Sequence, residues 1–240
     1  MYDRRLVLAA CLAALSAPAF AERKVAGSGR IATERRVIGG FDRIAIAGAF
    51  EVELRQGSSE GVELSGDDNL LALVETRLDG TGSRTLKIGP KPDVDLAPSQ
   101  PIRVRIDLVQ LTAIDMGGSS TLAATGLHVG KLAVAMGGSG RMKLVALDAE
   151  RLALSLGGSG RAEADGRAKS ASLNIGGSGQ VACAALAVDE VSVNIAGSGS
   201  AAVQANQRLS ISIAGSGRVR HTGAAVPTVS IVGSGDVRRG

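Results

Sequence analysis

A Gly-Ser pair recurs at nearly even intervals through the second half of this 240-residue chain. The glycine of each pair lies at position 118, 138, 158, 177, 197, 215 or 233, so the successive steps are 20, 20, 19, 20, 18 and 18 residues. A unit that recurs about every 19 residues is typical of solenoids, in which each repeat contacts only its neighbours. No other feature of the sequence constrains the fold as strongly.

Each Gly-Ser pair lies between two stretches in which apolar residues alternate with small or polar ones. Leu209, Ile211 and Ile213 alternate with two serines before one pair, and Val219 lies between two arginines after it. Alternation with a period of two indicates β-strands, and about 19 residues at roughly 3.3 Å each give a perimeter on the order of 60 Å. We therefore predict an all-β fold, a right-handed parallel β-helix. The hand follows because parallel crossover connections are almost always right-handed.

The Gly-Ser-Gly triplets are interpreted as structural corners of this β-helix. Glycine allows positive φ and close approach of neighbouring backbones, which stacked corners require. We also expect the stacked serines to form a ladder of hydroxyl groups. The predicted corner residues are Gly138, Ser139, Gly140, Gly158, Ser159, Gly160, Gly177, Ser178, Gly179, Gly197, Ser198, Gly199, Gly215, Ser216 and Gly217.

The segment before the regular repeats has a less regular version of the same pattern. Residues 41–57 match a repeat unit, with Ala49 in place of the corner serine. Residues 68–78 have the apolar spacing of one short helix, which we expect to cover the first coil as solenoid caps do. Residues 22–36 are expected to be an extended lead-in. The four prolines between residues 89 and 101 predict a surface loop.

The first 21 residues have the pattern of an export signal. Two arginines precede an apolar run over residues 6–17, and Ala-Phe-Ala at 19–21 matches a signal-peptidase site. The run is too short for a permanent membrane span, which needs roughly 20 apolar residues. A lipoprotein signal with lipidated Cys11 is the alternative. We expect an exported protein, in the periplasm or at the cell surface, with a single β-helix domain over residues 37–240.

Charge and side-chain chemistry argue against several classes of function. The net charge is only +4, without a long basic run, so we expect no nucleic-acid partner. After signal cleavage Cys183 is the one remaining cysteine, which excludes an internal disulfide and is interpreted as a core filler. His128 and His221 occupy unrelated positions, and the residues after the glycines lack the aspartates of calcium-binding repeats. We therefore expect no metal ion and no cofactor.

A polysaccharide-active enzyme is the alternative function. Asp148 and Asp189 occupy similar positions two coils apart, and the carboxylates of sugar hydrolysis lie roughly 5 to 9.5 Å apart. Aromatic residues, which usually line sugar-binding grooves, make up only 2% of the chain. Nucleophile elbows and phosphate-binding loops are absent from the sequence. We therefore expect a non-enzymatic protein without catalytic residues.

The outward residues of the first strand in each coil form a candidate binding face. They are small, uncharged and regularly spaced, and a flat face of this kind can pack against another flat surface. The members of this Ser/Asn face are Ser155, Ser172, Asn174, Ser192, Asn194, Ser210 and Ser212. The expected partner is an envelope polymer, a glycan or a protein surface. The alternative interpretation is that stacked columns simply require small residues.

Two further surfaces leave alternatives open. Arg141 and Arg161 stack in neighbouring coils with Arg218 farther along, where they are either solvated or in contact with anionic envelope polymers. The last coil presents an open strand edge, which is either covered by a partner, including a second copy in a homo-oligomer, or blunted by Arg238 and Arg239.

Three stretches and the repeated corners resemble, in order and spacing, one bacterial family, the auto-transporter adhesins with a head GIN domain. The stretches are "GGFDRIAIAGAFEVELRQG", "GVELSGDDNLLALVETRLDG" and "TLKIG", followed by the "GGSG" and "AGSG" corners. The resemblance covers residues 37–240. It implies an exported, non-enzymatic envelope protein with a β-helical fold and a role in binding or adhesion, and it supplies no catalytic residues.

Overall fold

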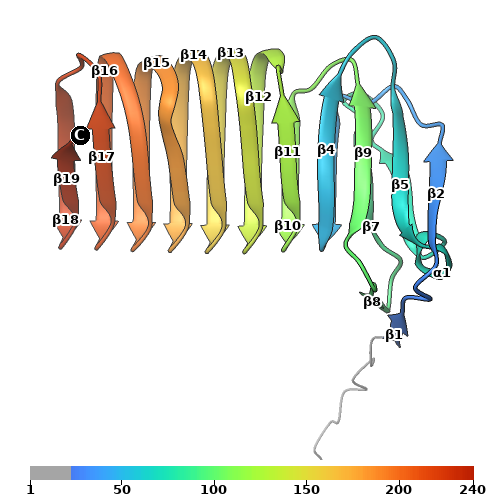
Figure 1. Ribbon diagram of the computed structural model, residues 1–240. Helices are drawn as coiled ribbons and strands as arrows, with labels where there is room; N and C mark the ends of the chain where they lie inside the picture. The colour runs from blue at the N-terminus through green and yellow to red at the C-terminus, as the bar shows by residue number, and fades with distance from the viewer. Residues whose placement is uncertain (1–22) are drawn as a thin grey trace, which may run out of the picture.

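The computed structural model describes residues 23–240, which form a parallel β-helix closed at one end by antiparallel strands (Figure 1). The predicted signal peptide, including Cys11, lies outside the described residues. Within them the one helix is α1 (Asp68–Leu71). The strands are β1 (Arg23–Ala26), β2 (Ile31–Arg36), β3 (Arg43–Gly48), β4 (Phe50–Gln56), β5 (Gly61–Asp67), β6 (Val74–Asp79), β7 (Thr85–Pro90), β8 (Val94–Ala97), β9 (Ile102–Leu108), β10 (Ala113–Gly118), β11 (Thr121–Thr125), β12 (His128–Gly138), β13 (Arg141–Gly158), β14 (Arg161–Gly177), β15 (Gln180–Gly197), β16 (Ser200–Gly215), β17 (Arg218–Thr222), β18 (Pro227–Gly233) and β19 (Asp236–Arg239).

Each coil has three sides, which we name first, second and third in chain order. In one coil the first side covers residues 131–138, the second 141–145 and the third 147–150. Strands β13 to β16 each run through the second and third sides of one coil and the first side of the next. All pairings between these coils are parallel and join equivalent residues. The prediction of an all-β parallel β-helix is confirmed.

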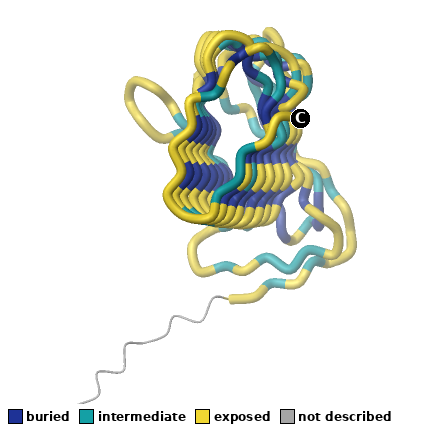
Figure 2. The backbone as a smooth tube through the Cα atoms, turned by 90° about the vertical axis from the view of Figure 1, so that its left-hand side faces the viewer, coloured by how far each residue is buried: buried dark blue, intermediate teal, exposed yellow. Residues whose placement is uncertain are grey.

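The core consists of columns of stacked aliphatic side chains. Val134, Leu154, Leu173, Val193 and Ile211 occupy equivalent positions on the first side, each at most 2% exposed. Figure 2 shows buried and exposed residues alternating along each coil, which is the period of two in the sequence. Full burial of one such side chain stabilises the fold by about 1.5–3 kcal/mol. Repeated aliphatic columns therefore take the place of an aromatic core.

The Gly-Ser-Gly triplets lie at the corner between the first and second sides. Gly138 has a φ of 97°, and the amide of Ser139 donates to the carbonyl oxygen of Gly118 in the preceding coil at 3.0 Å. A Cβ on Gly158 would lie 2.6 Å from the carbonyl oxygen of Gly138. Among the described residues no hydrogen bond joins neighbouring corner hydroxyls, so the expected ladder of serine hydroxyls is not formed. The backbone joins the corners instead.

Coil lengths differ because the corners before and after the third side absorb the extra residues, and the pairing of β15 with β16 shifts at both, between Cys183 and Ala187 and between Val188 and Glu190. The pairing register shifts between Leu144 and Leu147, and again between Glu163 and Asp165. Ala146 has a φ of 53°, and its amide donates to Oδ1 of Asp165 at 2.6 Å. The first side keeps its register, so the Gly-Ser corners remain stacked although their spacing varies between 18 and 20 residues.

The strands of the N-terminal region stack in an order different from their order in the sequence. The coil of β3 and β4 lies between the coil of β10 and β11 on one side and strands β7 and β9 on the other (Figure 1). After β4 the chain therefore runs outward through β5 and β6, returns through β7 and β9, and then crosses to β10. The alternating pattern identifies these strands but carries no signal for this order.

Antiparallel strands cover the N-terminal end of the β-helix. Strand β5 pairs with β9, β2 pairs with β5, and β6 pairs with β7, all antiparallel. The helix predicted over residues 68–78 is limited to Asp68–Leu71, because Val74–Asp79 pairs with β7 as a strand. Leu70 and Leu71 are buried, so the short helix does help to cover this end. Charged residues on β2 then protect the outer edge.

Residues 22–36 and 89–101 contribute strands. Residues 22–36 were expected to be extended, and they contain β1 and β2. The prediction of a surface loop over residues 89–101 is wrong for Val94–Ala97, which form β8. These residues pair with β1, about 70 positions earlier in the sequence. We name β1 and β8, a separate two-stranded sheet, the flap. Within residues 23–240 no helix reaches the length and apolar character that a membrane span requires.

Candidate functional site

The residues of the Ser/Asn face lie together on the first side of four consecutive coils. The strand register places them in two columns, one with Ser155, Asn174, Asn194 and Ser212 and the other with Ser172, Ser192 and Ser210. All of them point outward and are exposed or half-buried. One side-chain hydrogen bond runs along the face, from Nδ2 of Asn194 to Oδ1 of Asn174 at 3.1 Å. The result is a flat, uncharged array of hydroxyl and amide groups.

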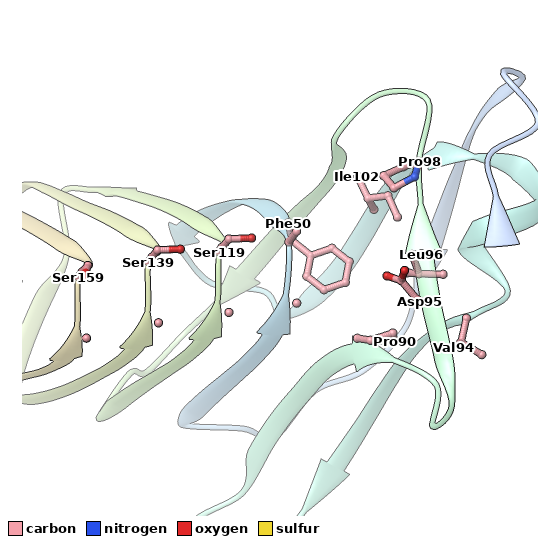
Figure 3. Close-up of a pocket in the computed structure, with 15 residues that line it drawn as sticks. Phe50, Pro90, Val94, Asp95, Leu96, Pro98, Ile102, Ser119, Ser139 and Ser159 are labelled. Carbon is pink, nitrogen blue, oxygen red and sulfur yellow. The ribbon is translucent and has the colours of Figure 1, made fainter. Parts of the chain in front are cut away.

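A groove that the sequence analysis did not identify runs between the flap and the corner row (Figure 3). Its volume is about 770 Å³. Figure 3 shows Leu96 of the flap on one side and the side chains of Ser119 and Ser139 on the other, with Phe50 and Pro90 between them. We name this cavity the corner groove. It combines apolar walls with a row of hydroxyl groups.

Phe50 gives the corner groove its aromatic wall. The strand register aligns Gly48 with Gly118, so Phe50 occupies the position of Ser120 in the next coil and of Gly140 in the coil after it. Its side chain is 3% exposed, and its amide donates to Oγ of Ser120 at 3.1 Å. The departure from the Gly-Ser-Gly pattern at Ala49 and Phe50 is the sequence signal that could have indicated this site.

Asp67 holds the flap in position. Its buried carboxylate accepts hydrogen bonds through Oδ1 from the Gly29 amide at 2.7 Å and the Ser99 hydroxyl at 2.6 Å. Oδ2 accepts the Ser99 amide at 2.8 Å. The hydrogen bonds from Ser99 hold the pKa of Asp67 below its ordinary value. Because Gly29 follows β1 and Ser99 follows β8, one ionised carboxylate fixes the outer wall of the corner groove.

Asp148 and Asp189, the two aspartates considered for catalysis, are not arranged as a catalytic pair. Asp148 forms an ion pair with Arg167 at 2.6 Å, and the hydrogen bond from Arg167 lowers its pKa, whereas a general acid needs a raised pKa. Asp165 accepts a backbone amide. The register aligns Arg167 with both Asp148 and Ala187, so Asp189 lies two residues away from the Asp148 column. These positions do not form a pair of facing carboxylates.

Cys183 and His221 occupy one inward-facing column. Val203 pairs with both of them, and they are 3% and 6% exposed. Burial raises the pKa of the Cys183 thiol to about 12, which makes it a poor nucleophile. His128 is exposed on another coil. Throughout residues 23–240 there is no group of three His, Cys, Asp or Glu side chains arranged to hold a metal ion.

One protein family matches this sequence. The family model described as "Putative auto-transporter adhesin, head GIN domain" matches residues 40–225. No protein of curated function matches the chain.

Several crystal structures share the fold. A "putative lipid binding protein" from Parabacteroides distasonis is 25% identical, with a TM-score of 0.75, and the match covers 91% of this chain and 100% of the other. A "putative adhesin" from Bacteroides fragilis is 20% identical, with a TM-score of 0.81 and coverage of 90% and 99%. Another from Parabacteroides merdae is 24% identical, with a TM-score of 0.70 and the same coverage.

Proposed function

The chain belongs to the family of auto-transporter adhesins with a head GIN domain, and from this premise we propose that it is an exported, non-enzymatic binding module of the cell envelope. Its location is the periplasm or the cell surface, either free after cleavage at residue 21 or anchored through Cys11. The observation that carries the proposal is the Ser/Asn face, seven uncharged polar residues held in register on four coils. We assign adhesion to this face.

The physical basis is the combination of many weak contacts with a rigid support. A hydrogen bond contributes a net of about 0.5–1.5 kcal/mol, so a single serine or asparagine cannot hold a partner. Neighbouring coils repeat the same groups about every 4.8 Å, and the strand pairing fixes their positions in advance. Little conformational entropy is therefore lost when a flat partner surface binds several groups at once.

The test is binding of the purified chain from residue 22 to immobilised glycans, envelope polymers and matrix proteins. The variant Asn174→Lys/Ser212→Lys places two charges in one column of the Ser/Asn face. The control Asn206→Lys/Gln207→Lys adds the same charge at exposed positions on the third side. We expect the first variant to lose at least tenfold in affinity and the control to retain binding. Equal binding by both variants, or no bound surface for the unmodified chain, contradicts the proposal.

A second candidate function is binding of an apolar chain, such as a lipid tail, in the corner groove. Its support is the apolar wall of Phe50, Pro90 and Leu96, together with the likeness to a solved protein described as lipid binding. Leu96→Asp should abolish binding of a fluorescent fatty acid to the protein. Val37→Asp, which changes a fully exposed valine outside the groove, should leave this binding unchanged. Retention of binding by Leu96→Asp would exclude this function.

A further inference from the structure

The second side of the β-helix carries its charges unevenly. At the N-terminal end, basic and acidic residues alternate between neighbouring strands and form ion pairs. Arg103 approaches Glu51 at 3.4 Å, and Arg105 approaches Glu53 at 3.5 Å and Glu63 at 2.9 Å. This end of the second side is therefore largely neutralised.

From residue 141 onward the second side is basic. Its two outward columns, which begin at Arg141 and Lys143, hold six basic and two acidic side chains, an excess of four positive charges. Ion pairs of 2.7 Å join Arg161 to Glu163 and Arg238 to Asp236. The remaining four basic residues have no ion-pair partner within the described part of the chain. We name this region the basic side; its cations are Arg141, Lys143, Arg161, Arg218, Arg220 and Arg238.

Small residues create a depression between these cations. Ala182, Ser200 and Ala202 lie between Arg161 and Arg218, and the cavity over them has a volume of about 350 Å³. Its floor is backbone and methyl groups, and its margins carry guanidinium and hydroxyl donors. The one carboxylate at the margin, Asp236, is paired with Arg238 at 2.7 Å. Carboxylate, sulfate and phosphate groups accept hydrogen bonds from arginine in a planar, two-point geometry. The depression therefore has the size and the donors to hold one anionic group.

Gln180 and Arg220 complete the set of donors around the depression. Arg161 donates to Oε1 of Gln180 at 3.1 Å, which orients the amide nitrogen of Gln180 as a further donor. Arg220 lies beside Ala202 in the strand register. Both side chains line the cavity.

We propose that the basic side binds an acidic polysaccharide that lies along the axis of the β-helix. Arg161 and Arg218 are three strands apart, which at about 4.8 Å per strand is roughly 14 Å. An extended glycan with regularly spaced acidic groups can therefore contact both arginines and place one acidic group in the depression. This site is on a different side from the Ser/Asn face and goes beyond the adhesion assigned to that face.

Charge and composition favour a polysaccharide over the other polyanions. Single-stranded nucleic acids are usually held by aromatic side chains that stack on bases, and the outward columns of the basic side contain no aromatic residue. Attachment to an anionic membrane usually adds apolar side chains that enter the interface, and these columns contain only charged, small or polar residues.

The experiment measures binding of the chain from residue 22 to dextran sulfate and to polygalacturonate, with neutral dextran, duplex DNA and phosphatidylglycerol vesicles as comparisons. The variant Arg218→Gln/Arg220→Gln removes two cations at the depression. The control Arg23→Gln/Lys24→Gln removes the same charge from the exposed strand β1. We expect affinity for both acidic polysaccharides to fall at least tenfold in the first variant and less than threefold in the control. Binding should also weaken between 50 and 300 mM salt, since screening shortens the range of exposed charges.

The proposal is overturned if both variants bind equally, since net charge alone would then explain the affinity. It is also overturned if duplex DNA or vesicles bind more tightly than both acidic polysaccharides. The variant Asn174→Lys/Ser212→Lys should keep its affinity for these polysaccharides, so a failure of the adhesion assigned to the Ser/Asn face is distinguishable from a failure of this site.

Discussion

The repeated coils and the N-terminal region share one aliphatic core but differ in the further contacts that join their strands. From β12 onward, parallel strands in register, aliphatic columns and backbone hydrogen bonds at the corners join one coil to the next. In residues 23–108, antiparallel pairs and ionised side chains connect segments that are distant in the sequence. The carboxyl groups with lowered pKa show the same contrast: Asp42, Glu53, Glu63, Asp67, Asp68 and Asp79 lie in the N-terminal region, and Asp148 in the coils.

This difference shows which kind of change each region tolerates. A coil repeats its contacts, so it depends on backbone geometry at a few fixed corners and little on any one polar side chain. The N-terminal region makes each contact once, so it depends on particular carboxylates such as Asp67. Changes in backbone geometry should therefore damage the coils most, and changes in ionisation should damage the N-terminal region most.

Gly197→Ala should have the largest effect on the coils. Gly197 has a φ of 126°, and a Cβ there would lie 2.6 Å from the carbonyl oxygen of Gly177. The backbone strain and the displaced coil should together lower the free energy of unfolding by about 3 kcal/mol, measured by urea denaturation. Gly130→Ala is the control, because its Cβ would meet nothing within 4 Å. Equal losses in both variants would contradict the role assigned to the corners.

Acid should open the N-terminal region before the coils. A carboxyl group whose pKa is lowered by folding stabilises the protein above its ordinary pKa of about 4, and this contribution is lost as the pH falls through the lower pKa of the folded state. Six such groups lie in the N-terminal region and one in the coils. Digestion with pepsin near pH 2.5, followed by mass spectrometry, should therefore give its first cuts within residues 23–108. First cuts within residues 128–222 would reverse the comparison.

The sequence predicted the coils well because their contacts are local and repeated. The alternation of Leu209, Ile211 and Ile213 with serines determines which side chains face the core, and the glycine spacing determines where each coil turns. The N-terminal region was predicted less well because strand pairing there overrides local propensity. Residues 74–79 have the spacing of a helix, but they pair with β7.

The local pattern marks the corner groove only through the departure from Gly-Ser-Gly at Ala49 and Phe50, and the outer wall of the groove could not be predicted from it. It forms where β8, which lies between proline-rich turns, pairs with β1 and is fixed by Asp67 against the cap. These contacts join residues about 30 to 70 positions apart in the sequence, and no period marks them. The Ser/Asn face was found because it follows the period of the coils, and its role in binding stays a prediction.

His221→Leu should stabilise the last coils by a smaller amount. His221 is 6% exposed, and its Nδ1 has no hydrogen-bond partner in the described structure. An unsatisfied buried polar atom costs about 1–3 kcal/mol, so leucine in this apolar column should raise the free energy of unfolding by about 1 kcal/mol. The measurement is the urea midpoint at pH 7, with Thr222→Val as a neighbouring control. A loss of stability in His221→Leu would show that the imidazole makes a favourable contact.

The hydrogen bond along the Ser/Asn face should contribute least. Asn194→Ala and Asn174→Ala remove the donor and the acceptor of an exposed contact of 3.1 Å. A double-mutant cycle should give a coupling free energy of about 0.5 kcal/mol. A coupling above about 2 kcal/mol would mean that side chains on this face, and not the backbone, hold the coils together.

The most direct test of this account is thermal unfolding, followed by circular dichroism, of two deletion variants. Removal of residues 159–177 joins Gly158 to Ser178 and deletes one whole coil, whereas removal of residues 159–167 deletes about half of one. If the coil is the unit of structure, the first variant should keep a β-sheet spectrum and one cooperative transition, and the second should lose both. Equal stability of the two variants, or loss of the fold in the first alone, would contradict the account.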